Sequence, residues 1–208
     1  MAKKKKNKFK LTPKKAALLA ALISLVSFLY KLSLGIISSS IVLIVASLST
    51  LIVFVSKFIY YKKMDGERIA KKRAYFVMAI LAASFGALFL LFTVLKVAGI
   101  DTSNQREFND IVGYILIGFM LIMFVLSVLG LKGALEKTDL MIIGLKEVIF
   151  VSALADAVII EGFLYYAVPY IRKLPLMEFI NSYFPLIIAI VMLIIPVLML
   201  RRLKNYKV

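Results

Sequence analysis

Three polar residues with the potential for chemistry lie in one apolar stretch, 140–168, which contains Ser152, Asp156 and Glu161. If this stretch is a membrane-spanning helix, Asp156 lies about 24 Å from its beginning, close to the middle of the bilayer. A carboxylate at that depth costs about 2.5–3.5 kcal/mol on insertion scales. We therefore expect Asp156 to face the interior of a helix bundle and to have a partner there.

Asp156 has three functional interpretations: a cation ligand, a proton carrier, or a polar contact for a substrate. The structural alternative is a protonated Asp156 that joins helices by hydrogen bonds to Ser47, Ser49 or Thr50 in an earlier apolar stretch. Ser152 precedes Asp156 by one helical turn, so the two side chains are expected on one face. Ser152 and Asp156, together with Ser49, are therefore the candidate transport or ion-binding residues.

Glu161 follows Asp156 by five residues, which is about 140° around a helix. The two carboxylates therefore do not share a face, and we do not expect them to act as an acid–base pair. Glu161 lies nearer the outer boundary of its span. Lys31 is expected at the outer end of the first span, so we predict a structural ion pair between Lys31 and Glu161.

Other charged residues of the apolar stretches lie close to predicted span ends. Lys31 and Lys57 are near enough to an end to extend their amines to the membrane surface. Lys146 and Glu147 lie within about two turns of the start of their span, where we expect them at the interface. None of these four residues is predicted to be deeply buried.

The elements that must position these side chains are long apolar helices. The sequence is 62% hydrophobic, whereas ordinary globular domains are roughly half apolar. Its apolar runs reach about 20 residues, the length that crosses a hydrocarbon core of about 30 Å, and in lipid such runs must be helical. We expect an all-α, polytopic membrane bundle of six spans, at 16–35, 40–61, 74–98, 111–131, 140–168 and 179–200.

The distribution of Lys and Arg predicts the orientation of this bundle. The tails 1–15 and 201–208 are basic, and so are the loops after the second and fourth spans. Both termini are therefore expected in the cytoplasm, with the protein in the cell membrane. The net charge of +16 comes from residues at the ends of apolar runs, so the predicted partners are anionic lipid headgroups and not nucleic acid.

The composition also excludes several kinds of chemistry. The sequence contains neither Cys nor His, which excludes disulfides, thiolate metal sites and His-based catalytic triads. It contains no phosphate-binding or dinucleotide-binding glycine motif and no metalloprotease signature. We expect no cofactor, no metal site and no enzymatic activity, because membrane enzymes that modify lipids bring several polar residues to one interface.

Two segments resemble the cation diffusion facilitator family. Residues 31–43 read KLSLGIISSSIVL and resemble the turn between that family's first two spans; residues 150–157 read FVSALADA and resemble its fifth span. The resemblance implies six spans, cytoplasmic termini, cation transport and a homodimer. The family's C-terminal cytoplasmic domain has no counterpart after residue 200.

The family's transport site takes two metal ligands from the second span and two from the fifth. The corresponding positions here are Ser49, Val53, Ser152 and Asp156, and Asp156 alone matches a metal ligand. One carboxylate with hydroxyls is a poor tetrahedral Zn²⁺ site. The resemblance therefore implies a divergent member that lacks the usual zinc site and moves either a different solute or none.

Three functions follow from these observations. The first is a small secondary transporter, a divergent cation transporter that uses Asp156 in mid-membrane. The second is a substrate-binding subunit of an energy-coupling-factor importer, whose small-residue helix contact resembles the pairs Ala16/Ala20 and Ala17/Ala21. The third is a non-transporting scaffold or assembly protein in which Asp156 is merely packed.

Overall fold

The computed structural model describes residues 12–37, 41–98, 110–137, 139–167 and 174–206. Within these residues the regular structure consists of helices, with no strand, which confirms the predicted all-α class. The basic N-terminal tail up to residue 11, the Ser38–Ser40 turn and the loop 99–109 lie outside the described residues. The helices are α1 (Pro13–Ile37), α2 (Ile41–Lys63), α3 (Arg68–Val97), α4 (Asp110–Leu135), α5 (Leu140–Ala167) and α7 (Pro175–Asn205).

Each predicted span corresponds to one helix, but several helices are longer than the apolar run. Helix α3 begins at Arg68, inside the basic segment that we predicted as a loop, and α7 continues to Asn205 within the predicted tail. The reason is that hydrophobic length marks only the part of a helix inside the hydrocarbon. The turn between α2 and α3 is correspondingly short: the Gly66 N–H donates to the Lys63 carbonyl at 2.9 Å.

The surface of the bundle is apolar. Large hydrophobic side chains are exposed on the outer helices, for example Val26 on α1 (67%) and Ile122 on α4 (61%). By length and composition α1, α2, α3, α4 and α7 qualify as membrane spans. A soluble monomer does not expose apolar area on this scale, so the protein is a multi-pass membrane protein. Helix α5 is not among these five; it carries Lys146, Glu147, Asp156 and Glu161.

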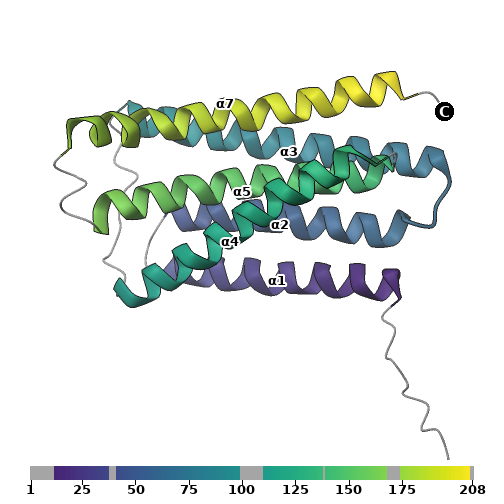
Figure 1. Cartoon of the computed structure of the whole chain (residues 1–208), viewed down its shortest axis with the longest axis horizontal. Helices are drawn as coiled ribbons and strands as arrows, with labels where there is room; N and C mark the ends of the chain where they lie inside the picture. The colour runs from purple at the N-terminus through teal and green to yellow at the C-terminus, as the bar shows by residue number, and fades with distance from the viewer. Residues whose placement is uncertain (1–11, 38–40, 99–109, 138, 168–173, 207–208) are drawn as a thin grey trace, which may run out of the picture.

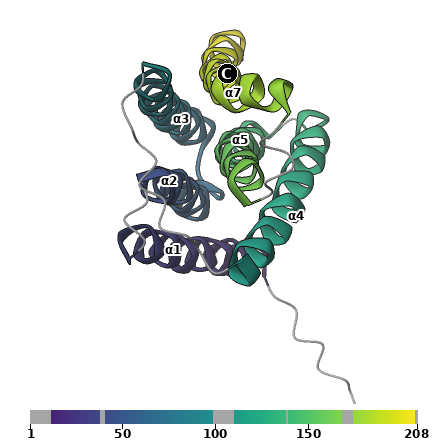
Figure 2. The ribbon, with the colours of Figure 1, turned by 90° about the vertical axis from the view of Figure 1, so that its left-hand side faces the viewer.

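Helix α5 lies in the middle of the bundle (Figures 1 and 2). It packs against α2, α3, α4 and α7, whereas α1 packs closely on α2 alone among the described helices. Met141, Val151 and Ala155 of α5 are almost completely buried. The helix that carries Glu147 and Asp156 is thus the one that its neighbours enclose, so these two carboxylates face protein.

Small residues allow close contacts between helices. Gly86 of α3 lies against α7, where a Cβ atom would be 3.3 Å from the Met192 carbonyl oxygen. The tightest place is Gly144 of α5, where a Cβ atom would lie 2.5 Å from the Tyr75 ring. Tyr75 is fully buried, so its ring has little space to move away.

We expect Gly144→Ala to destabilise the protein, because the added methyl group must displace the Tyr75 ring. Overpacking of this kind costs about 1–3 kcal/mol. The measurement is the midpoint of thermal unfolding in detergent. Gly118→Ala in α4 is the matched control, since a Cβ atom there meets nothing within 4 Å. A Gly144→Ala midpoint equal to or above that of the control would contradict the packing described here.

Candidate functional site

The centre of the candidate site is an ion pair between α1 and α5. Lys31 Nζ donates a hydrogen bond to Asp156 Oδ1 at 2.8 Å. Both residues are buried, each with 8% of its surface exposed. As predicted, Asp156 faces the bundle interior and has a partner there. That partner is an ammonium group, so the pair is formed by two opposite charges in an apolar surrounding.

The predicted Lys31–Glu161 pair is wrong, and Lys31 does not extend to the membrane surface. Lys31 lies about 27 Å along α1 from Pro13, and Asp156 lies about 24 Å along α5 from Leu140. These two helix starts are at the same end of the bundle (Figure 1), so the two side chains are at nearly the same depth. Glu161 is about 32 Å along α5, more distant from Lys31.

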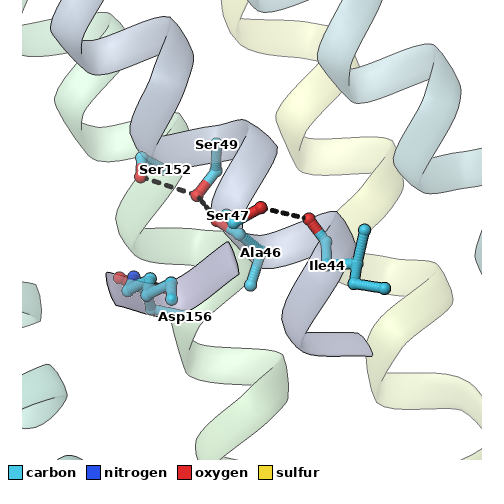
Figure 3. Close-up of polar contacts among 7 residues, drawn as sticks. Ile44, Ala46, Ser47, Ser49, Ser152 and Asp156 are labelled. Carbon is cyan, nitrogen blue, oxygen red and sulfur yellow. Dashed lines mark hydrogen bonds and ion pairs between the residues drawn. The ribbon is translucent and has the colours of Figure 1, made fainter. Parts of the chain in front are cut away.

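A serine pair connects α5 to α2 beside the ion pair. Ser152 Oγ donates to Ser49 Oγ at 3.0 Å, and Ser49 Oγ donates to the Ala46 carbonyl at 2.7 Å (Figure 3). The structure therefore brings together Ser49 and Ser152, two of the three candidate residues, and places Asp156 one turn further along α5. The hydrogen bond of Ser152 goes to Ser49 and not to Asp156.

The hydroxyl partners that we predicted for Asp156 do not bind it. Ser47 Oγ donates to the Ile44 carbonyl of its own helix at 2.7 Å (Figure 3), and Ser49 is engaged as described above. Thr50 Oγ1 is buried and has no hydrogen-bond partner within the described ranges. The structural alternative, in which hydroxyl groups of α2 hold a protonated Asp156, is therefore wrong, because Lys31 supplies the hydrogen bond.

Glu161 belongs to a different part of α5. Both of its carboxylate oxygens are buried and lack a hydrogen-bond partner among the residues described. Lys96 of α3 is close enough for an electrostatic interaction with Glu161, and its Nζ donates to the Asn181 carbonyl of α7 at 3.5 Å. Glu161 is thus a further acid with buried carboxylate oxygens, nearer the end of α5 than Asp156 and close to a different cation.

The sequence did not reveal a buried cluster around Glu147. Tyr75 Oη of α3 donates to Glu147 Oε2 at 2.9 Å, and Arg202 of α7 donates both to Tyr75 Oη at 3.2 Å and to Glu147 Oε1. Glu147 is 4% exposed, so the prediction that it is not deeply buried is wrong. It lies near the start of α5, as expected, but protein encloses it. The position of these residues along their helices is the property that could have indicated the cluster. Tyr75 and Glu147 each lie about 10 Å from the start of their helices.

No protein-family model matches this chain, and neither a curated protein nor a solved structure matches it. The functional interpretation consequently depends on the site itself.

The site does not form a metal centre of the usual kind. In the described part of the chain, three or more acidic side chains do not come together anywhere. Ser152 donates to Ser49, and Ser49 donates to the backbone, while Lys31 donates to the carboxylate of Asp156. The arrangement is suited to exchange of one positive charge for another at Asp156.

The ion pair predicts a strong energetic coupling between Lys31 and Asp156. Removing one partner of a buried pair leaves an unpaired charge and costs about 3–5 kcal/mol, whereas replacing both by apolar residues is often neutral. We expect Lys31→Met to lower the thermal unfolding midpoint in detergent, and the double variant Lys31→Met/Asp156→Leu to regain most of the loss.

The matched control is the exposed ion pair between Lys14 and Asp65, whose charged atoms lie 2.9 Å apart. Exposed pairs contribute about 0–1 kcal/mol, so Lys14→Met and Asp65→Leu should have small, additive effects. Additive effects of the Lys31 and Asp156 substitutions would contradict the buried pair.

Proposed function

We propose that the protein is a small secondary transporter in the cell membrane, in which a proton or a small cation competes with Lys31 for Asp156. In this proposal α5 is the sixth span, and both termini lie in the cytoplasm. The observation that carries the proposal is the buried ion pair between Lys31 and Asp156. Ionisable residues within membrane spans are rare and commonly mark ion or substrate pathways.

The position of α1 favours a movable element. Helix α1 packs closely on α2 but not on α5, within the described residues. The long Lys31 side chain is therefore the link that reaches from α1 to Asp156. When that link opens, α1 loses its ion-pair contact with α5 and remains packed on α2.

Charge balance explains how the pair would couple to transport. Lys31 and Asp156 together are neutral, and separating them leaves two charges in an apolar environment, which is costly. A proton or cation that binds Asp156 neutralises the carboxylate and releases Lys31, whose ammonium group then favours a wetter position. Binding of the ion to Asp156 therefore lowers the free energy that is needed to open the pair. The side chains of Lys31 and Asp156 retain 10% and 12% exposure, so the pair is not completely enclosed.

Polar side chains continue along α5 on both sides of the pair. Glu147, Ser152, Asp156 and Glu161 extend over about 21 Å of helix, which is a large part of a hydrocarbon core of about 30 Å. Ser152 and Asp156 share one face of α5, whereas Glu147 and Glu161 lie about 140–180° around the helix from them. In this proposal the proton or cation uses the face of Ser152 and Asp156.

The test is transport by the purified protein in vesicles that contain a pH-sensitive dye. Gradients of Na⁺, K⁺, Mg²⁺ and Zn²⁺ are imposed one at a time, and movement of protons in the opposite direction is recorded. We expect one of these cations to drive proton flux, and Asp156→Asn to reduce that flux at least tenfold. Asn retains an oxygen that accepts a hydrogen bond from Lys31 but cannot exchange a charge.

Asp65→Asn is the control, because it makes the same chemical change in an exposed ion pair. It should leave the flux unchanged. The proposal fails if wild-type vesicles show no flux above protein-free vesicles for any of the four cations, or if Asp156→Asn transports as well as the wild type.

A second candidate function is a scaffold or assembly protein, in which the ion pair only joins α1 to α5. This alternative is favoured by the surroundings of Asp156, since Ser47 and Ser49 donate to their own helix backbone and do not surround the carboxylate as ion ligands. In that case Asp156→Asn should change the stability of the protein, and neither the wild type nor the variant should transport a cation.

A further inference from the structure

A cavity of about 310 Å³ lies between α1, α2, α4 and α5, on the other side of the bundle from the Glu147 cluster. Most of its lining is apolar. Two lysines, Lys57 of α2 and Lys146 of α5, also line it. The apolar lining side chains come from three helices: Ala17, Ala20, Met123, Leu126, Leu145 and Ile149.

The cavity has positive charge without a matching negative charge. Lys57 Nζ donates to Ser24 Oγ at 2.7 Å and to the Ala20 carbonyl at 3.3 Å, both neutral groups. Lys146 makes neither a hydrogen bond nor an ion pair with any described residue, and no carboxylate lines the cavity. Two ammonium groups that share a cavity repel each other. An anion that binds between them is attracted by both.

The depth of the two lysines corresponds to that of lipid headgroups. Lys57 lies about 9 Å before the end of α2 at Lys63, and Lys146 lies about 9 Å after the start of α5 at Leu140. Helix α2 is about 35 Å long and α5 about 42 Å, both longer than a hydrocarbon core of about 30 Å. The lysines are therefore near the boundary between acyl chains and headgroups.

The cavity opens towards the side of the bundle. Helix α4 crosses the bundle diagonally, so that α1 and α4 diverge towards the end where α1 begins (Figures 1 and 2). Helices α1 and α4 make no close contact within the described residues. Leu126 of α4, which lines the cavity, is 56% exposed on the outer surface. A molecule held by the lysines can therefore extend between α1 and α4 into the region of the acyl chains.

We propose that this cavity is a binding site for an anionic phospholipid of the adjacent leaflet. The phosphate lies between the ammonium groups of Lys57 and Lys146, and an acyl chain leaves the cavity between α1 and α4 over Met123 and Leu126. The positive charge recognises the phosphate and its net negative headgroup, and the apolar lining accepts the chain. This site is separate from the Lys31–Asp156 pair and does not depend on the transport proposal.

The test is lipid binding to the detergent-purified protein, followed by native mass spectrometry. Phosphatidylglycerol and phosphatidylcholine with identical acyl chains are titrated in parallel. We expect phosphatidylglycerol to bind at least tenfold more tightly. Lys146→Gln should weaken phosphatidylglycerol binding about fivefold, as expected for one charge near a headgroup. Lys57→Gln/Lys146→Gln should remove the preference between the two lipids.

Lys62→Gln/Lys63→Gln is the matched control. These lysines are exposed at the same end of α2, and their loss removes the same charge from the protein without altering the cavity. The control should retain the lipid preference. A control that loses as much preference as the cavity variant would overturn the proposal, because the effect would then come from surface charge in general.

Two further measurements keep the proposal testable if the double variant does not fold. Lys146→Gln alone removes no recorded hydrogen bond, so its helix content and elution as a single species should match the wild type. Leu126→Trp fills the exit between α1 and α4 without a change of charge, and it should weaken phosphatidylglycerol binding as well. Unchanged binding by Leu126→Trp, or displacement of the lipid by millimolar inorganic phosphate alone, would overturn a lipid site.

Discussion

Two opposite charges in an apolar interior must stay together, and this constraint fixes the arrangement of Lys31 and Asp156. Neither charge is stable alone at this depth, and their atoms meet at 2.8 Å. Because α1 packs closely on α2 and not on α5 in the described residues, the ion pair is the contact that joins α1 directly to the central helix. The same contact is the one that an incoming proton or cation would have to replace.

The central position of α5 follows from the same constraint. A helix with four charged side chains is stable in a membrane when protein surrounds it, and three polar groups of α5 have partners on different neighbours. Asp156 meets Lys31 of α1, Ser152 meets Ser49 of α2, and Glu147 meets groups on α3 and α7. These contacts, made at different depths, hold the outer helices in register around α5 more specifically than apolar packing does.

The sequence predicted the helices and the burial of Asp156, because apolar length and the cost of a buried charge are local properties of the chain. It did not predict the partners, since the lateral neighbours of a helix depend on how the whole bundle packs. We predicted an ion pair between Lys31 and Glu161 because we judged the depth of Lys31 from the outer end of the first span. Counting from the first residues of α1 and α5 would have placed Lys31 level with Asp156. Glu147 was missed because its cluster requires residues from three separate helices.

The most direct measurement of the central contact uses the absence of cysteine from this chain. Cysteines are introduced as the pair Lys31→Cys/Asp156→Cys or as the pair Lys31→Cys/Glu161→Cys, and a short bifunctional thiol reagent is applied to membranes. Mass spectrometry of the digested protein then gives the yield of each crosslinked peptide. The account predicts efficient crosslinking between positions 31 and 156 and much less between 31 and 161. A higher yield for 31 and 161, or no crosslink between 31 and 156, would contradict it.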